Sequence, residues 1–97
     1  MDQIGIKKAV QIAFLEVQTL FEKEHYMDLG LEETELTDND EYWLITVGYN
    51  IKNPNRTDSP IDLVTGSGSL DPLIRKYKTF KIEAKTGKVR SMKIREI

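Results

Sequence analysis

Hydrophobic and polar residues alternate along the last quarter of the chain in two segments, and this pattern predicts a β-hairpin. Because successive side chains of a strand point to opposite faces, each segment has one core face. The expected core residues are Lys78, Phe80, Ile82 and Ala84 in the first strand, and Arg90, Met92 and Ile94 in the second. The two faces coincide only if the connecting loop has an odd length. A three-residue loop over 85–87, with Gly87 in the left-handed conformation at a bulge, meets that condition.

The N-terminal quarter carries apolar residues at the spacing of an amphipathic helix, from Ile4 to about His25. Most of them fall within a stripe about 120° wide, which we expect to be the helix's side of the core. These residues are Ile6, Val10, Ala13, Phe14, Val17, Leu20 and Phe21. Ile4, Ile12 and Leu15 lie outside the stripe, so either a loop or strand edge of the same chain covers them or they contact a partner. Under the second alternative, Ile12 and Leu15 are candidate self-association residues of a homodimer.

A further hairpin is predicted in the first half of the chain. A weak strand from Leu31 to Thr37 leads into the turn triplet Asp38-Asn39-Asp40, and a clearer strand follows from Tyr42 to Ile51. In the clearer strand, the residues expected to face the helix are Trp43, Ile45, Val47, Tyr49 and Ile51, and those expected to face outward are Tyr42, Leu44, Thr46 and Gly48. Only one face is fully apolar, as in an antiparallel sheet that a helix covers on one side.

Residues 52–69 are rich in Pro, Gly, Asn, Ser, Thr and Asp and show no periodicity, so we expect a long irregular loop there. Ile61, Leu63 and Val64 are candidates to fix the middle of this loop to the body of the domain. The next residues, Asp71-Pro72-Leu73-Ile74, are typical of a short helical turn with Asp at the cap and Pro at the first position.

These elements predict one α+β domain over residues 1–97, with one long N-terminal helix packed on a three- or four-stranded antiparallel sheet. A content of 39% hydrophobic and 31% charged residues is ordinary for a globular chain. The net charge of −2 gives no overall attraction to nucleic acid or to an anionic membrane. The lack of cysteine fits a reducing compartment, and the N-terminus lacks the apolar run of a signal peptide. We therefore expect a cytoplasmic protein without a membrane partner.

The closing hairpin contains the segments Tyr77-Lys78-Thr79-Phe80-Lys81-Ile82, Thr86-Gly87-Lys88-Val89 and Ser91-Met92-Lys93-Ile94. An aromatic strand followed by Thr, Gly, a basic residue and Val resembles small bacterial domains of the PepSY-like kind, which belong to the cystatin-like group of folds. It also resembles the hairpins of some immunity proteins. The resemblance implies a helix lying across a curved antiparallel sheet, and a role in binding other proteins.

Few residues in this sequence are suited to carry out chemistry. His25 is the only histidine, and we interpret it as a surface imidazole near a helix C-terminus rather than a metal ligand. The eight acidic residues from Glu24 to Glu41 lack the glycine and the terminal glutamate of a calcium loop. The run Gly66-Ser67-Gly68-Ser69 lacks the lysine of a phosphate-binding loop. Without a cysteine or a histidine partnered to a serine, we expect no enzyme activity, no catalytic or metal-binding residue and no cofactor.

Charge is distributed unevenly along the chain. Residues 75–95 contain nine Lys or Arg residues but a single acidic residue, Glu83. We favour the interpretation that the acidic first hairpin neutralises this basic hairpin through cross-strand pairs. The alternative is that the basic and aromatic outward face binds nucleic acid or another anionic ligand. The candidate binding surface on this face consists of Tyr42, Leu44, Tyr77, Lys81, Lys93 and Arg95.

These patterns together predict a small non-catalytic protein-binding module, immunity-like or regulatory, that acts through the outward sheet face and the loop over 52–69. The first alternative is binding of nucleic acid, which the acidic net charge disfavours, or of another anionic ligand by the basic hairpin. A third hypothesis is a small-molecule pocket of the NTF2-like kind, in which a sheet curls around a cavity. The expected partner is another protein, with a second copy of the chain as an alternative.

Overall fold

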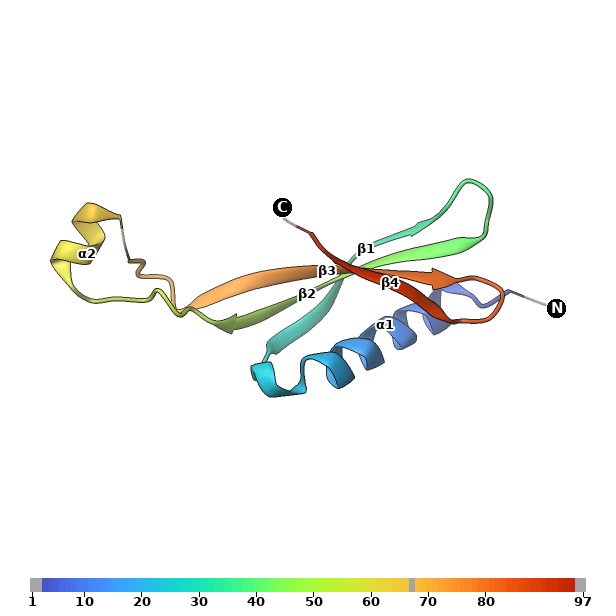
Figure 1. Ribbon diagram of the computed structural model, residues 1–97, viewed down its shortest axis with the longest axis horizontal. Coiled ribbons are helices and arrows are strands. Elements are labelled where there is room, and N and C mark those ends of the chain that lie inside the picture. The colour runs from blue at the N-terminus through green and yellow to red at the C-terminus, as the bar shows by residue number, and fades with distance from the viewer. Residues whose placement is uncertain (1–2, 67, 96–97) are drawn as a thin grey trace.

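The computed structural model describes residues 3–66 and 68–95, and within them a four-stranded antiparallel sheet is covered on one face by a long helix (Figure 1). The elements in chain order are α1 (Ile6–Leu20), the 3₁₀ turn η1 (Glu22–Glu24), β1 (Met27–Leu36), β2 (Tyr42–Lys52), α2 (Pro60–Thr65), β3 (Leu73–Glu83) and β4 (Val89–Ile94). The strands lie side by side in the order β1-β2-β3-β4, so each pairs with its neighbour in sequence. The predicted α+β class, with one long helix on an antiparallel sheet, is confirmed.

Helix α1 is shorter than predicted. It begins after Gly5 and ends at Leu20, instead of continuing to about His25. The 3₁₀ turn follows, and His25 then adopts a left-handed φ of 51° before β1 begins. Strand β1 starts at Met27, earlier than the predicted Leu31, because its first residues pair with the far end of β2. That pairing is a tertiary interaction that the local pattern does not contain.

The buried stripe of α1 is rotated relative to the predicted one. Its fully buried residues are Ala9, Ala13 and Val17, which at 100° per residue centre the stripe about 40° from the predicted position. These side chains are small, so the helix backbone can lie close to the sheet. Ile6 and Leu20, the first and last residues of α1, also belong to the predicted stripe, but they are exposed at the two ends of the helix.

The sheet contributes the larger side chains of the core. Ile45, Val47 and Tyr49 of β2 are fully buried under α1, and Trp43 and Ile51 at the two ends of this inward-facing set are half-buried. The predicted inward face of β2 is therefore confirmed. On β3 the predicted set is also found, because Phe80, Ile82 and Ala84 are each fully buried.

Tyr49 carries the main polar group of this core. Its hydroxyl donates to the Oε2 atom of Glu24 at 3.3 Å. The ring centroid lies 5.8 Å from that of Phe21 and 5.7 Å from that of Tyr26. Burial, together with the nearby Glu24 carboxylate, raises the pKa of Tyr49 to about 12.

The closing hairpin has the predicted register but a different loop. Phe80 pairs with Met92, and Gly87 is left-handed with a φ of 78°. However, the Glu83 amide donates to the Lys88 carbonyl at 2.8 Å, so residues 84–87 form the loop instead of 85–87. A loop with an even number of residues would place the two core faces on opposite sides.

A bulge in β4 restores the alignment. Lys81 pairs with Ser91 but Ile82 pairs with Val89, so Arg90 is the extra residue. Val89 consequently packs against the core, whereas Arg90 is exposed. The prediction that Arg90 belongs to the core face is wrong. Ile94 pairs with Lys78 and so lies on the predicted face, but at the sheet edge it is 72% exposed.

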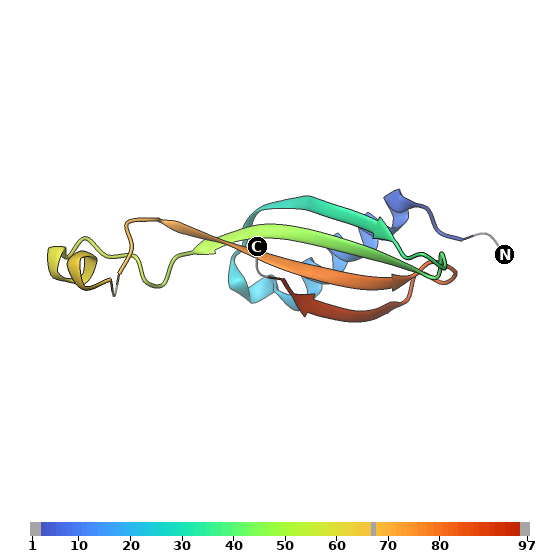
Figure 2. The same ribbon diagram turned by 90° about the horizontal axis from the view of Figure 1, so that it is seen from above.

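Strands β2 and β3 continue beyond β1 and β4, and their ends and the segment that joins them project as an arm, here defined as residues 51–74 (Figures 1 and 2). The arm makes the molecule elongated, with extents of 61 × 26 × 17 Å. The predicted irregular loop over 52–69 is wrong in part, because Pro60–Thr65 form α2 at the end of the arm. The predicted helical turn over 71–74 is also wrong, because Leu73 and Ile74 pair with Lys52 and Ile51 as the start of β3.

Candidate functional site

The six residues predicted to form a binding surface share the face of the sheet that points away from α1. They come from β2, β3, β4 and the residue after β4, namely Tyr42, Leu44, Tyr77, Lys81, Lys93 and Arg95. The register brings them together, because Leu44 pairs with Lys81, which pairs in turn with Ser91. Their neighbours along the strands, such as Ile45 and Phe80, belong to the core under α1.

A shallow hollow of about 310 Å³ lies on this outward face. It is lined by Thr37, Leu44, Thr79, Lys81, Ser91 and Lys93. The Lys81 ammonium also lies 4.3 Å from the centroid of the Tyr42 ring, a favourable cation–π arrangement. The hollow thus combines one apolar side chain with two lysine cations and hydroxyl groups, which suits a ligand that carries negative charge.

Ion pairs neutralise much of the remaining basic charge. The pairs are Arg75 with Glu32 at 2.6 Å, Arg95 with Glu33 at 2.5 Å, and Arg90 with Glu83 at 3.3 Å. The first two join the β3–β4 half of the sheet to the acidic strand β1, as the cross-strand interpretation predicts. Arg95, although part of the predicted surface, is therefore engaged within its own chain.

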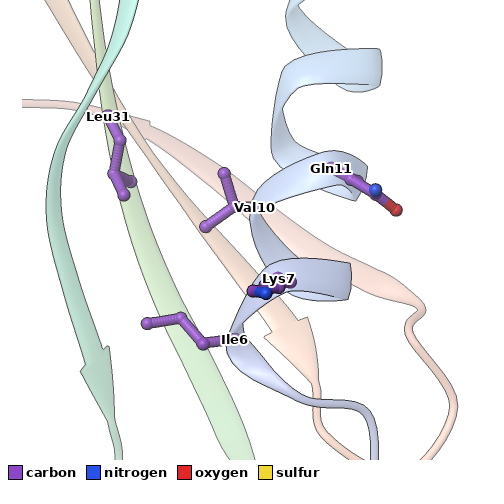
Figure 3. A pocket seen from close by; sticks show the side chains of 5 residues that line it. All are labelled: Ile6, Lys7, Val10, Gln11 and Leu31. Carbon is purple, nitrogen blue, oxygen red and sulfur yellow. The ribbon is translucent and has the colours of Figure 1, made fainter.

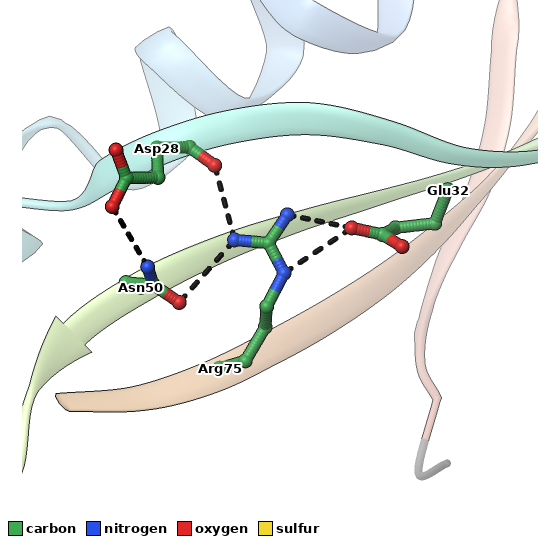
Figure 4. Close-up of polar contacts among 4 residues, drawn as sticks. All are labelled: Asp28, Glu32, Asn50 and Arg75. Atoms are coloured by element: carbon green, nitrogen blue, oxygen red, sulfur yellow. Dashed lines mark hydrogen bonds and ion pairs between the residues drawn. The ribbon is translucent and has the colours of Figure 1, made fainter.

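Arg75 is the centre of a polar cluster at the base of the arm (Figure 4). Its guanidinium donates to Glu32 Oε1 at 2.6 and 3.2 Å, to the Asp28 carbonyl at 3.0 Å and to Asn50 Oδ1 at 3.2 Å. Asn50 in turn donates to the Asp28 carboxylate at 2.9 Å, and Asp28 has a left-handed φ of 54°. Gly48 provides the space, since a Cβ there would lie 2.7 Å from Glu32 Oε1. These contacts brace the base of the arm against β1.

Helix α2 (Pro60–Thr65), here called the arm tip, exposes a group of apolar side chains. On α2, Ile61 is 73% and Val64 is 87% exposed, and Leu63 of α2 and Leu70 of the same arm are also exposed. The prediction that Ile61, Leu63 and Val64 fix this segment to the body is wrong, because the arm carries them away from α1 and the sheet (Figures 1 and 2). A local signal for α2 does exist in Ser59-Pro60, since proline favours the first position of a helix.

Asn53 connects the two chain segments that leave the sheet, residues 53–55 and 71–72, here called the neck of the arm. Its backbone amide donates to the Pro72 carbonyl at 3.0 Å and its side-chain amide to the Asp71 carbonyl at 2.7 Å. Its Oδ1 atom accepts from the Asn55 amide at 2.9 Å. Asn53 itself is buried, so these bonds are shielded from water. The arm tip is therefore presented on an ordered support.

A second apolar feature is a surface groove between α1 and the edge strand β1 (Figure 3). The groove has a volume of about 410 Å³ and is lined by Ile6, Lys7, Val10, Gln11 and Leu31. Figure 3 shows Ile6 and Val10 extending from α1 toward the side of Leu31. Ile6 is exposed at the first position of α1, whereas Val10 is half-buried and also packs against the core. The groove was not predicted, since the local pattern assigned Ile6 and Val10 to the core.

The two predicted self-association residues have different environments. Ile12 is half-buried against the core, and a Cβ at Gly87 of the β3–β4 loop would lie 3.0 Å from its Cδ1 atom. A loop of the same chain thus covers Ile12, and Ile4 is likewise packed against the core. Leu15 is 59% exposed, and at 100° per residue it lies about 160° from the centre of the buried stripe.

The residues considered for chemistry lie apart. His25 is exposed, and within residues 3–66 and 68–95 no three His, Asp or Glu side chains come close enough to hold a metal ion. In the same ranges no buried side-chain nitrogen or oxygen lacks a hydrogen-bond partner. Of the run Gly66-Ser67-Gly68-Ser69, Ser67 lies outside the described residues, and Gly66 has a φ of 79°.

No helix in the described part of the chain has the length and apolar character needed to cross a bilayer. The resemblance to PepSY-like and cystatin-like domains stays a prediction, because the chain matches no protein-family model, no curated protein and no solved structure.

Proposed function

We propose that this protein is a non-catalytic protein-binding module that holds its partner through the apolar tip of the arm. The observation that carries this proposal is the exposure of Ile61 and Val64, at 73% and 87%, on a helix that lies far from the core. Burying each of these side chains would contribute about 1.5–3 kcal/mol. Exposed apolar side chains that gather at one place are typical of interaction sites.

The charges near the tip favour a protein partner over a phosphate-bearing one. Residues 53–72 contain three aspartates and one arginine, so the phosphates of nucleic acids or of anionic lipids would be repelled. The Arg75 cluster at the base and Asn53 at the neck support the same proposal, because a pre-ordered arm loses little conformational entropy when it binds.

The direct test is affinity capture from a lysate treated with nuclease, with the parent chain and the double variant Ile61→Glu, Val64→Glu as baits. We expect a protein that the parent retains and the variant does not. Ile94→Glu is the matched control, because Ile94 is 72% exposed on the body of the domain, and it should retain the same protein as the parent. Identical captures with all three baits would contradict a role for the arm tip.

A second candidate function is binding of an anionic ligand in the hollow of the outward sheet face. The specific observation in its favour is the pair of lysines, Lys81 and Lys93, that line this hollow beside Leu44. Reversing both charges should abolish such binding and its salt dependence together. Lys85→Glu, Lys88→Glu is the matched control, since both lysines are exposed and lie in the β3–β4 loop, outside the lining of the hollow.

A further inference from the structure

We propose that the partner of the arm tip is a second copy of this chain, whose groove between α1 and β1 receives Ile61 and Val64. This inference rests on the proposed function, because it names the occupant of the same arm tip. Like the arm tip, the groove presents aliphatic side chains, namely Ile6, Val10 and Leu31. Leu31 is 46% exposed. The volume of the groove is about 410 Å³, within the roughly 300–1,000 Å³ typical of ligand clefts.

The arm tip cannot dock in the groove of its own chain. Helix α2 lies at one end of the molecule, and the first turn of α1, which carries Ile6 and Lys7, lies toward the other end (Figures 1 and 2). The elongated shape, 61 Å in its longest dimension, keeps the two apolar features apart. Each copy consequently has one unfilled groove and one uncovered tip.

Charge complementarity favours the groove over other apolar surfaces. Lys7 lines it, and the segment that would dock there carries Asp71 and also Asp58, which pairs with Arg56 at 4.0 Å. Opposite charges at the rim of a contact guide its orientation and disfavour wrong partners. The tip of one copy is thus matched to the groove of another in both polarity and charge.

Reciprocal docking would produce a closed dimer. If the tip of each copy occupies the groove of the other about a two-fold axis, two identical contacts form at once and no tip remains free. The second contact then forms within an existing complex, which strengthens the whole without any new type of interaction.

Introduced cysteines give a direct test, because the chain has none of its own. A tagged Val64→Cys protein is mixed with an untagged Leu31→Cys protein, exposed to mild oxidation and separated on a non-reducing denaturing gel. The proposal predicts a disulfide between the two different variants. Leu15→Cys replaces Leu31→Cys in the matched control, since Leu15 is a comparably exposed leucine outside the groove, and it should give at least about tenfold less of the linked product.

Charge variants provide an independent measurement of the same contact. Sedimentation of the parent over a range of concentrations should show a dimer, and Ile61→Glu, Val64→Glu should be monomeric with an unchanged circular dichroism spectrum. Lys7→Glu should weaken the dimer by roughly two- to fivefold. Lys8→Glu is the control, because Lys8 is exposed beside Lys7 but does not line the groove.

Two results would overturn the proposal: a parent that sediments as a monomer at every concentration, or equal disulfide yields from Leu31→Cys and Leu15→Cys. A dimer that Leu15→Glu dissociates and the tip variant does not would place the contact on α1 and also overturn it. Failure of the proposed function is distinguishable from these results. If the parent is a monomer but the tip variant alone loses a captured protein, only the identity of the partner is wrong.

Discussion

Replacement of Tyr49 by phenylalanine tests the description of the core through its alkaline stability. Tyr49 is fully buried, and its hydroxyl donates to the Glu24 carboxylate at 3.3 Å. Burial and this carboxylate both disfavour the phenolate, and they raise the pKa from 10.0 to about 12. Each pKa unit corresponds to about 1.4 kcal/mol, so ionisation of Tyr49 is less favourable in the folded than in the unfolded chain by roughly 3 kcal/mol.

The sign of the pH dependence follows from the direction of this change. Below pH 10 both states hold the proton, so the contribution of Tyr49 to stability is fully present. As the pH rises from 10 to 12, the unfolded chain loses the proton first, and the free energy of unfolding falls by about 1.4 kcal/mol per pH unit. The phenylalanine variant lacks this term. It should be about 1 kcal/mol less stable near neutral pH because it lacks one hydrogen bond, but more stable than the parent by pH 12.

The assay is denaturant unfolding followed by the fluorescence of Trp43, at steps from neutral pH to about pH 12. The parent and Tyr49→Phe curves of stability against pH should cross between pH 10 and 11. At that point the parent has lost roughly one third of the free energy of unfolding that it loses in total through ionisation of Tyr49. The two proteins differ only at position 49, so the difference between the curves isolates Tyr49. Parallel curves over the whole range would refute the reasoning, as would ionisation of Tyr49 near pH 10 in the folded protein, seen in the tyrosinate difference spectrum.

Two further predictions concern the core and the arm. Phe80→Ala removes a fully buried ring and should lower the free energy of unfolding by about 3–5 kcal/mol; Phe14→Ala, at a half-buried position, should cost clearly less, and equal losses in thermal melts would contradict the packing. Asn53→Ala removes the neck contacts to Asp71 and Asn55 and should accelerate protease cleavage within the arm without moving the melting transition of the body; an unchanged cleavage rate would show that the neck does not depend on Asn53.

The strand faces were predictable because the residue pattern of each central strand allows only one of its two faces to be buried. From Trp43 to Ile51 every second residue of β2 is large and apolar, and Phe80 and Ile82 repeat this spacing in β3. Burying one face therefore sets the direction of Ile45, Val47 and Phe80 together. The outward position of Leu44 and Lys81 follows from the same alternation. The candidate surface on the sheet could therefore be assigned from sequence, although its function could not.

The rotation of α1 and the bulge in β4 were beyond the local pattern. The apolar residues of α1 cover so wide an arc that several orientations bury a similar number of them, and only contact with the sheet selects Ala9, Ala13 and Val17. In β4, the inward position of Val89 depends on the extra residue at Arg90. A bulge has no strong sequence signal when the residue involved is neither glycine nor proline.

The arm shows why an apolar residue in a sequence is weak evidence for burial. Ile61 and Val64 were assigned to the body because apolar side chains are usually buried, but their position depends on how far β2 and β3 pair beyond their neighbours. That pairing extends to Lys52 and Leu73, whereas on the other side of β2 the pairing with β1 ends at Asn50. Beyond these two pairs the arm consists of the segment 53–72, and the apolar residues of that segment do not indicate whether it folds back on the body.

Both the arm tip and the groove leave apolar side chains uncovered. Ile61 and Val64 are exposed at one end of the molecule, and Ile6 and Leu31 are exposed on its body. Each such side chain represents about 1.5–3 kcal/mol that burial would recover, a large amount beside the roughly 5–15 kcal/mol that stabilises a domain. A monomer has no means of recovering it, since its arm points away from its own groove. The proposed association would account for both features with one contact, whereas a monomeric function would require a separate reason for each.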